Sequence, residues 1–316
     1  MSEKVFIGID TSNYTTSFAI CNLDGKILEN HKILLPVKEG ERGLRQSDAV
    51  FAHIKNFFNI SERIKNAQNQ YKILAIGCSA FPRDCEGSYM PCFLVGESFC
   101  ELITSIYNLE CYKFSHQAGH IMAALYSSNA SIQDDFVAFH VSGGTTEILH
   151  VKPKSNGLEI KQIGGTNDLN AGQAIDRIGV KLGLKFPCGP AMEALAKNNK
   201  QDIPRHKISV QRFECNLSGL ENLAENLYSK SQSKELTAAF VLDYISRVLE
   251  KITQNIREQY KCENIIYAGG VMSNLIIQSN LGKKFDNVFF STYEFSSDNA
   301  SGIALLTRNK FLNKEV

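Results

Sequence analysis

Apolar and polar positions at the start of the chain predict strands joined by tight turns. Apolar, β-rich runs occupy residues 4–10 and 16–23, and a third occupies residues 26–35. The dipeptide Asp24–Gly25 separates the second run from the third, and Asp-Gly is a strong signal for a hairpin turn. We therefore expect three hairpin-connected strands, with a polar tip between the first two.

The next hundred residues alternate between helical and strand-like patterns. Apolar side chains at helical spacing predict a helix over residues 48–69, and the run ILAIGCS over 73–79 predicts a buried strand. Two prolines and a glycine punctuate residues 82–93, which predicts a loop, and residues 96–109 return to a helical pattern. A further helix is expected over residues 115–128, with Ser115 as its N-cap.

The second half repeats this plan. Residues 136–153 predict strand, glycine turn and strand, and helices follow over 171–184 and from about 238 to 260. In the longer helix, apolar residues recur at every fourth position and predict a core-facing stripe, namely Phe240, Tyr244, Val248, Ile252 and Ile256. Two further strands and a closing helix after Asp298 complete the chain. Two α/β lobes with a cleft between them are the simplest arrangement.

Composition narrows the classes of protein to be considered. The 316 residues carry 34 Lys+Arg against 33 Asp+Glu, so the chain lacks the large positive field of a stand-alone nucleic-acid binder. Its nine cysteines are odd in number and include no C-x-x-C pair, which favours neither a disulfide framework nor a zinc ribbon. The start MSEKVFIGID lacks a basic leader, and no apolar run approaches the roughly 20 residues that cross a bilayer. We expect a cytoplasmic protein without a membrane partner.

Two hairpin tips have the chemistry of phosphate-binding turns. DTSNYTTS begins at Asp10, SGGTTE begins at Ser142, and each joins two apolar runs. Hydroxyl side chains and backbone N–H groups at such turns can form a concave set of donors for phosphate, and glycine permits close approach. Taken alone, a Ser-, Thr- and Gly-rich hairpin tip is more often a simple turn than a phosphate-binding site. A third glycine turn, YAGGVMSN, is expected to follow a strand and open a helix, but it does not fit the G-x-G-x-x-G pattern of a dinucleotide fold.

The stretch SHQAGHI places His116 and His120 one helical turn apart, where both imidazoles can reach one cation. Spacing alone favours two ordinary histidines, one capping and one packed. A zinc peptidase of the H-E-x-x-H type needs a glutamate after the first histidine to activate water, and that position is Gln117. The residues leave a two-histidine metal site open and make this peptidase chemistry improbable.

Eight motifs in order resemble the TsaD family, the tRNA threonylcarbamoyladenosine synthases once labelled O-sialoglycoprotein endopeptidases. The resemblance covers nearly the whole chain and includes GIDTS, HQAGH, VSGGTTE, AGQAIDR, GLKFPCGPAMEALA, NLSGLEN, AGGVMSN and SSDNASGIA. It implies an actin-like fold of the sugar-kinase and DnaK-type ATPase class. The lobes expected on this basis are residues 1–113 with 294–316, and residues 114–293 with helical insertions.

The resemblance also implies a site and a reaction. The metal, iron or zinc, would be held by His116, His120 and Asp298, and the substrate would be ATP or an adenylate. Nucleotide contacts are implied for Thr11, Ser12, Val141, Ser142, Gly143, Gly144, Thr145, Asp176, Gly189 and Asn274. Asp10 is the acid left at the first tip and is the expected catalytic residue. The implied activity is metal-dependent transfer of a threonylcarbamoyl group from its adenylate to adenosine of tRNA, with helper subunits such as TsaB-like and TsaE-like proteins.

The chain departs from the family pattern at several polar positions. Tyr14 and Thr15 stand where the family has acids, Thr145 where it has a histidine, and Gln173 and Glu221 where it has a glutamate and a lysine. The first four changes leave fewer acid–base groups in the expected site. Two alternatives therefore stay open: a divergent paralogue that carbamoylates another acceptor, and a non-catalytic nucleotide-binding scaffold.

Overall fold

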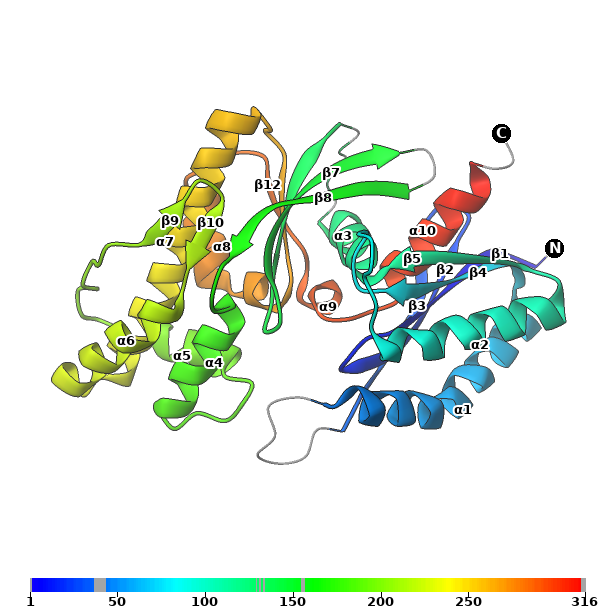
Figure 1. The fold of residues 1–316 in the computed structure, drawn as a ribbon, viewed down its shortest axis with the longest axis horizontal. Coiled ribbons are helices and arrows are strands. Elements are labelled where there is room, and N and C mark those ends of the chain that lie inside the picture. The colour runs from blue at the N-terminus through cyan, green and yellow to red at the C-terminus, as the bar shows by residue number, and fades with distance from the viewer. Residues whose placement is uncertain are drawn as a thin grey trace. The chain divides into compact units, whose positions relative to one another are not determined.

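The chain divides into two units, each built around one β-sheet (Figure 1). The computed structural model describes residues 2–36, 44–128, 130, 132, 134–154 and 157–313. Unit 1 comprises residues 1–129, 153–160 and 297–316, and unit 2 comprises residues 130–152 and 161–296. These limits differ from the lobe limits expected at 113/114 and 293/294, chiefly because the helix that carries both histidines belongs to unit 1.

Unit 1 has a five-stranded sheet in the order β3-β2-β1-β4-β5. Its strands are β1 (Lys4–Thr11), β2 (Thr15–Asn22), β3 (Ile27–Leu34), β4 (Lys72–Phe81) and β5 (Glu110–Ser115). The first three strands pair antiparallel, as the hairpin turns predict, and β1, β4 and β5 run parallel. The carboxyl ends of β1, β4 and β5 consequently lie at one edge of the sheet.

Helices cover both faces of this sheet. They are α1 (Gln46–Gln70), α2 (Pro91–Tyr107), α3 (His116–Ser127) and α10 (Ser301–Leu312). On one face, Ile7 and Ile9 of β1 join a core with Ile60 of α1 and Cys100 of α2. On the other face, a second core contains Phe6 of β1 together with residues of α3 and α10. Alternate residues of β1 therefore serve two separate cores.

The α3–α10 contact explains why α3 belongs to unit 1. A methyl group added to Gly302 of α10 would overlap the backbone carbonyl of Gly119 in α3. One added to Gly8 of β1 would meet the backbone of Ala300 and Ala304. Glycine at these positions lets α10 lie directly on both the sheet and α3.

Unit 2 repeats the plan of unit 1 with additions. Its sheet has the order β12-β11-β6-β7-β8-β10-β9. The strands are β6 (Phe136–Val141), β7 (Thr146–Lys154), β8 (Gly157–Thr166), β9 (Ser209–Gln211), β10 (Glu214–Asn216), β11 (Ile265–Ala268) and β12 (Val288–Phe290). As in unit 1, the first hairpin is antiparallel, and β6, β11 and β12 run parallel. The short strands β9 and β10 pair antiparallel.

The helices of unit 2 include two, over residues 171–181 and 234–260, that lie close to where the periodicity predicts them. The helices of this unit are α4 (Ala171–Lys181), α5 (Gly189–Lys197), α6 (Ser218–Ser231), α7 (Lys234–Tyr260), α8 (Leu275–Gly282) and α9 (Tyr293–Ser296), with a 3₁₀ turn, η1, over Gly270–Ser273. All five residues of the predicted stripe in α7 are buried. The helix begins four residues before the expected start, where the Ser233 hydroxyl accepts a hydrogen bond from the Leu236 backbone N–H.

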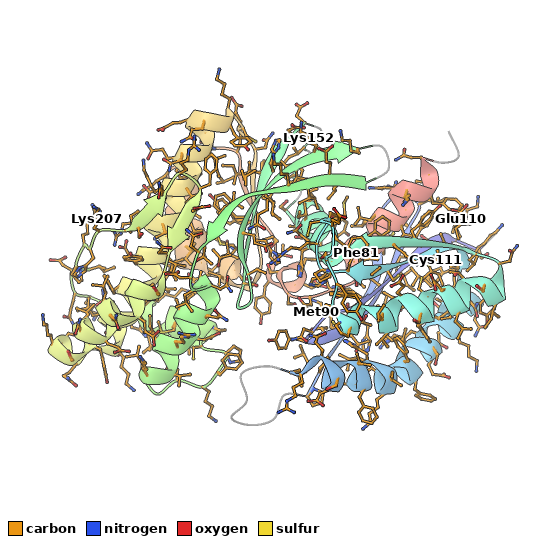
Figure 2. All side chains as sticks on the ribbon, viewed as in Figure 1. Phe81, Met90, Glu110, Cys111, Lys152 and Lys207 are labelled. Carbon is orange, nitrogen blue, oxygen red and sulfur yellow. The ribbon has the colours of Figure 1, made fainter. Side chains whose placement is uncertain are left out.

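Two sequence predictions were wrong in detail. The stretch 82–93 is not all loop, because α2 begins at Pro91, one residue after Met90 (Figure 2). Proline is well suited to the first position of a helix, where its missing N–H costs nothing. The turn after β11 does not open an α-helix directly, because η1 intervenes before α8. Within the described part of the chain, no helix combines the length and apolarity that a membrane span requires.

Candidate metal centre and glycine-rich tips

The helix α3 presents two histidines from its first turn and a half. It begins where the Ser115 hydroxyl caps it, accepting a hydrogen bond from the Ala118 backbone N–H at 3.0 Å, as predicted. His116 is the first helical residue and His120 lies one turn later. Their Nε2 atoms are 3.0 Å apart, so both rings are directed at one point.

Asp298 completes a three-residue group from a distant part of the sequence. Its Oδ1 lies 3.2 Å from His120 Nε2 and 3.6 Å from His116 Nε2. The three candidate ligand atoms all lie within 4.8 Å of one another. The structure thus brings together the three residues predicted to bind metal, all of them in unit 1.

Asp10 and two serines support this group. Asp10 Oδ1 accepts hydrogen bonds from His116 Nδ1 at 2.8 Å and from the Ser79 hydroxyl. The Ser12 hydroxyl donates to Asp298 Oδ2 at 2.5 Å. A carboxylate on Nδ1 places the proton there and leaves the Nε2 lone pair for a cation, which is the usual support of a metal-bound histidine. Asp10 is only 1% exposed, and its Oδ2 has no hydrogen-bond partner.

The electrostatics of the group favour a cation. Burial by itself would lower the pKa of His116, but the charge and hydrogen bond of Asp10, with those of Asp298, raise it to about 10. The two histidines hold the pKa of Asp298 well below its usual value despite burial. In the metal-free protein a proton on His116 therefore neutralises part of the carboxylate charge, and a metal must displace it.

The residues present fit a divalent metal. Two imidazole nitrogens and one carboxylate oxygen are a donor set used by both catalytic zinc and non-haem iron. The buried, unpartnered Oδ2 of Asp10 adds negative charge behind His116. The donor chemistry does not choose between the two metals.

At the first tip, Thr11 and Ser12 have structural partners in unit 1. The Thr11 hydroxyl donates to the Cys92 carbonyl at 2.9 Å and accepts from the Gly96 N–H at 3.2 Å, so it anchors the start of α2. Ser12 is bonded to Asp298. Both are buried. These contacts support positioning of the metal group by Ser12 more than direct nucleotide contact by either residue.

Sequence reasoning missed His53, which braces this tip. Its Nε2 lies 2.8 Å from the Ser12 carbonyl oxygen, and its Nδ1 lies 2.8 Å from the Thr16 hydroxyl. A carbonyl can only accept, so Nε2 carries the proton and Nδ1 accepts from Thr16. The only signal in the sequence was a histidine on a predicted amphipathic helix. Ser79 was missed too, because it reads as the polar end of an apolar strand.

The second tip, in unit 2, is an open glycine turn. The Ser142 hydroxyl accepts from the backbone N–H of Gly144 and Thr145 at 3.3 and 3.1 Å, which closes the turn. Side chains added at Gly143 and Gly144 would meet nothing within 4 Å, so the turn is accessible to a ligand. Val141 is fully buried and holds the end of β6. Thr145, which replaces the family's histidine, has the imidazole of His140 3.5 Å from its hydroxyl.

Among the other residues predicted to bind nucleotide, Asp176 lies in the middle of α4, whereas Gly189 and Asn274 lie at helix starts in unit 2. Asp176 Oδ1 accepts from the Cys188 N–H at 2.7 Å, next to Gly189 at the start of α5, and burial raises the Asp176 pKa. Asn274 caps α8 by accepting from the Ile276 and Ile277 N–H groups at 3.1 Å.

The glycine turn after β11 lies beside the second tip. The carboxyl ends of the parallel strands β6 and β11 are neighbours, and a methyl group on Gly269 would overlap the Val141 carbonyl. The structure therefore brings the second tip and the turn that leads to Asn274 to the same edge of the unit 2 sheet. The edge at which parallel strands end is the usual ligand-binding edge of α/β sheets.

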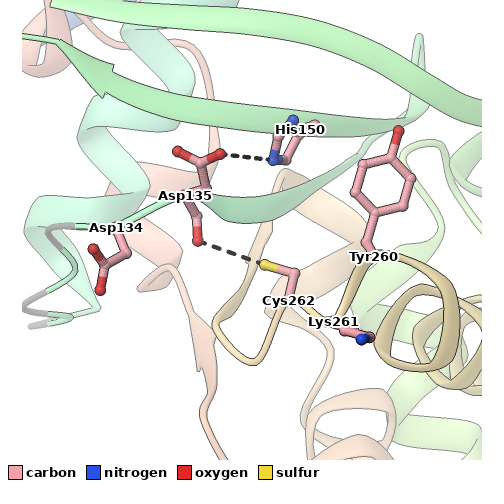
Figure 3. A pocket seen from close by; sticks show the side chains of 6 residues that line it. All are labelled: Asp134, Asp135, His150, Tyr260, Lys261 and Cys262. Atoms are coloured by element: carbon pink, nitrogen blue, oxygen red, sulfur yellow. Dashed lines mark hydrogen bonds and ion pairs between the residues drawn. The ribbon is translucent and has the colours of Figure 1, made fainter.

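A cavity of about 480 Å³ in unit 2 contains none of these residues (Figure 3). It is lined by Asp134, Asp135, His150, Tyr260, Lys261 and Cys262. Asp135 is paired with His150 at 3.3 Å, and its backbone carbonyl accepts from the Cys262 thiol at 3.6 Å. Because Asp135 already bonds to His150 and Cys262, this cavity is a weaker candidate for function than the second tip or the metal centre.

Comparison with solved structures shows the fold. HypF from T. kodakarensis matches with a TM-score of 0.67 at 12% identity, over 98% of this chain. This chain spans a little under half, 48%, of that HypF chain. A ROK family glucokinase from Streptomyces griseus matches with a TM-score of 0.52 at 12% identity, over 96% of this chain and 99% of its own. The fold is thus the actin-like fold of the sugar kinases, as the motifs predict.

Comparison of sequences identifies the family. The chain is 28% identical to a tRNA N6-adenosine threonylcarbamoyltransferase of Streptococcus suis, over 100% of this chain and 94% of the relative. A relative of the same name from Thermodesulfovibrio yellowstonii is also 28% identical, over 99% of this chain and 96% of its own. Residues 53–305 match the TsaD family, described as tRNA N6-adenosine threonylcarbamoyltransferase. The chain therefore belongs to the TsaD family.

Proposed function

We propose that the protein transfers a threonylcarbamoyl group from its adenylate to the N6 amine of an adenosine in tRNA. The observation that carries this proposal is the convergence of His116, His120 and Asp298 within 4.8 Å, with Asp10 behind His116, in a chain of this family. The group retains every metal ligand that the family motifs imply.

The side chains around the metal group have distinct roles. Asp10 keeps the Nδ1 proton on His116, Ser12 orients Asp298, and His53 fixes the backbone of Ser12. We therefore assign Asp10 a positioning role, which is narrower than the catalytic role expected from the sequence. Lewis-acid polarisation of a substrate oxygen is the chemistry that iron or zinc supplies when bound at such a site.

The residues of unit 2 are assigned to the adenylate. The open backbone of Gly143 and Gly144 is the proposed phosphate contact, and Ser142 holds the turn in that conformation. Asp176 uses one carboxylate oxygen for Cys188, and its second oxygen is the proposed ribose contact, because a carboxylate accepts at both oxygens. Gly189 adjoins this position and is assigned to the base. Asn274 contributes by shaping the turn at the start of α8.

Helper proteins belong to the same proposal. The net charge of +1 gives little attraction for the tRNA backbone. Helices α1 and α2 expose large apolar side chains that suit a protein partner, namely Phe51, Ile54, Phe58, Leu102 and Ile106. We propose that a TsaB-like subunit binds these helices and that a TsaE-like protein acts with the assembly.

The test is a reaction of the purified, metal-loaded protein with threonylcarbamoyl-adenylate and unmodified tRNA, with and without helper subunits. Modified nucleoside and released AMP are both quantified by mass spectrometry. We expect modified nucleoside, which is lost in His116→Ala and kept in His31→Ala, a histidine of β3 outside the site. AMP without modified nucleoside would indicate another acceptor. Neither product, with the adenylate still bound, would indicate a scaffold.

A further inference from the structure

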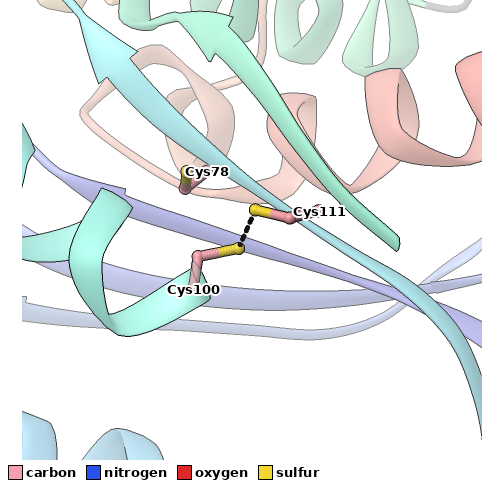
Figure 4. Close-up of side chains that lie close together, drawn as sticks. All are labelled: Cys78, Cys100 and Cys111. Carbon is pink, nitrogen blue, oxygen red and sulfur yellow. Dashed lines mark hydrogen bonds between the residues drawn. The ribbon is translucent and has the colours of Figure 1, made fainter. Parts of the chain in front are cut away.

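Three cysteines from three elements of unit 1 meet within the sheet–helix core (Figure 4). Cys78 lies on β4, Cys100 on α2 and Cys111 on β5. Their sulfur atoms all lie within 4.8 Å of one another, and those of Cys100 and Cys111 are 3.1 Å apart. All three are free thiols. No linear pattern in the sequence indicates this group, because the residues are 22 and 11 positions apart.

The surroundings of this thiol group are apolar on the side of the core. Cys78 and Cys100 have no exposed surface, and they belong to the core formed by Ile7, Ile9 and Ile76 with residues of α1. Within the described residues, no imidazole or carboxylate completes the group as a fourth ligand. Glu97, one turn before Cys100, is paired with Lys113 at 2.6 Å.

Cys111 connects the thiol group to the surface of unit 1. It is only half-buried, and it lies on β5, the edge strand of the sheet. Hydrogen bonds from the Cys100 and Cys78 thiols, with the Lys113 charge, lower the pKa of the Cys111 thiol, although burial opposes them. The bond to Cys111 is the main reason that the pKa of Cys100 is raised. Because metals bind thiolates, a cation at this point would replace the protons on the three sulfurs.

The number and type of donors select the class of cation. Thiolates without oxygen or nitrogen donors prefer soft cations, and structural zinc and iron–sulfur sites need four ligands, not three. A cation with three sulfurs at about 2.3 Å holds them about 4 Å apart. The Cys100 and Cys111 sulfurs, 3.1 Å apart, would have to separate by about 1 Å. We propose that Cys78, Cys100 and Cys111 form a trigonal thiolate site for a soft cation, with Cu(I) as the physiological member of that class.

This site is separate from the His116–His120–Asp298 group. Cys78 joins the core on the α1 and α2 face of the sheet, whereas His116 and His120 lie on α3, which packs on the other face. The two groups also differ in donors, since one offers only sulfur and the other only nitrogen and oxygen. Each therefore prefers a different metal, and occupation of one does not require the other.

The test uses the reduced full-length protein under anaerobic conditions. Cu(I) is supplied as its acetonitrile complex in competition with bathocuproine disulfonate, whose absorbance reports the Cu(I) that the protein does not hold. Cys85, the exposed thiol, is replaced by Cys85→Ser throughout to remove adventitious binding. We expect the protein to retain one equivalent of Cu(I). X-ray absorption should show only sulfur atoms bound to the copper.

Matched variants decide the assignment. Mutation of a residue that only supports a metal ligand already lowers metal affinity by about tenfold or more. Removal of a ligand itself, in Cys100→Ser, should therefore weaken Cu(I) retention by at least about tenfold. Cys21→Ser, another buried cysteine in the core on the opposite face, should retain Cu(I) as the parent does. Cys111→Ser, at the half-buried edge position, is the second test if Cys100→Ser fails to fold. No retention by the parent, retention by both cluster variants, or nitrogen and oxygen in the first shell would overturn the proposal.

Discussion

A single buried carboxylate, Asp10, determines which nitrogen His116 offers to a metal. Its Oδ1 accepts the Nδ1 proton at 2.8 Å, so Nε2 points at His120 and Asp298. The same carboxylate raises the His116 pKa to about 10 together with Asp298. Asp10 thus makes His116 a better ligand and, at the same time, a stronger base for the proton that competes with the metal.

This dual effect predicts the behaviour of Asp10→Asn. Loss of the charge should weaken metal binding by about 10–100-fold, the usual cost of removing a support of a ligand. Wild-type affinity should rise with pH until His116 loses its proton near pH 10, and the rise should end at lower pH in the variant. Metal affinity measured by chelator competition across pH tests both effects.

The control for this prediction is Asp24→Asn, at the exposed turn before β3. It removes the same charge from unit 1 without touching the histidines. We expect the wild-type affinity and pH profile from this control. An Asp10→Asn protein that follows the wild-type pH profile would contradict the positioning role of Asp10.

At the residue scale, the sequence predicted which three residues would lie together better than it predicted the residues that support them. His116 and His120 are one turn apart on an amphipathic helix, and the family motifs added Asp298. Ser79 could not be predicted, because the register that places it beside Asp10 depends on pairing of β1 with β4 across about sixty residues of chain. Thr11 was expected at the nucleotide, but its hydroxyl is used to anchor α2.

Among the elements, the close contact of α3 with α10 holds the metal group together. Both histidines lie on α3, and Asp298 lies three positions before Ser301, the first residue of α10. The helices approach so closely that neither Gly119 nor Gly302 has room for a side chain. Distances between the ligands therefore depend on two residues that contact no ligand.

We accordingly expect Gly302→Ala to weaken both the fold and the site. Overpacking at a close contact typically costs about 1–3 kcal/mol of unfolding free energy, and separation of the helices should lower metal content as well.

Gly282→Ala in α8 is the control, because its added methyl group meets nothing within 4 Å. There the better helix propensity of alanine should leave stability unchanged or raised. Urea unfolding and metal analysis of both variants provide the test; equal stability of the two would refute the packing argument.

A second prediction for the elements concerns Asp168, which caps α6 from another part of unit 2. Its carboxylate accepts from the backbone N–H groups of Leu217 and Ser218 at 2.8 and 3.2 Å, and from the Ser218 hydroxyl. Burial raises the pKa of Asp168, but the hydrogen bonds together outweigh burial and lower the pKa to about 2. Asp168→Asn should cost about 1 kcal/mol of unfolding free energy at neutral pH, the usual value of a helix cap.

The sign of the pH effect follows from the depressed pKa. Stabilisation by Asp168 is fully present above the unfolded pKa near 3.8 and is lost as pH falls toward about 2. The difference in unfolding free energy between wild type and Asp168→Asn should therefore narrow over this range. A constant difference down to the lowest pH at which both proteins are folded would show that the charge of Asp168 is not what stabilises α6.

Elements with a strong local pattern were predictable from the sequence, whereas β8, β9, β10, α5 and α6 were not predicted. The hairpins and the α7 stripe follow from local periodicity, which the folded chain preserves. The start of α2 was missed because Pro91 indicates both a loop and a helix start, and only packing of the following turn on β1 decides between them. The order of strands in each sheet could not be derived from periodicity, since it depends on contacts between distant segments.

For the whole molecule, the metal ligands are confined to one of two units. His116, His120 and Asp298 all belong to unit 1, and the second tip, Asp176, Gly189 and Asn274 belong to unit 2. A ligand that binds only the folded state stabilises the part that it contacts, by about 4 kcal/mol at a thousandfold excess over its dissociation constant. Stability of the two units should therefore respond differently to metal.

Removal of the metal is expected to show this difference in hydrogen exchange. Chelation should speed amide exchange in α3 and at the start of α10, where the ligands lie, and should leave α7 of unit 2 at its original rate. Exchange measured by mass spectrometry on peptides from both units provides the test. The His116→Ala variant should exchange as the chelated protein does, with or without added metal. Equal acceleration in α7 and α3 would contradict a site confined to unit 1.

The insertion of unit 2 into the sequence of unit 1 sets the order in which the metal centre can form during synthesis. Chains emerge from the ribosome with the N-terminal part first, and domains fold largely as units. Asp298 and α10 follow the whole of unit 2 in the chain, 178 positions after His120. A nascent chain can therefore present the two histidines, but not the third ligand or the helix that packs on α3. Metal loading at the proposed site with all three ligands is consequently a late event, which follows synthesis of the whole of unit 2.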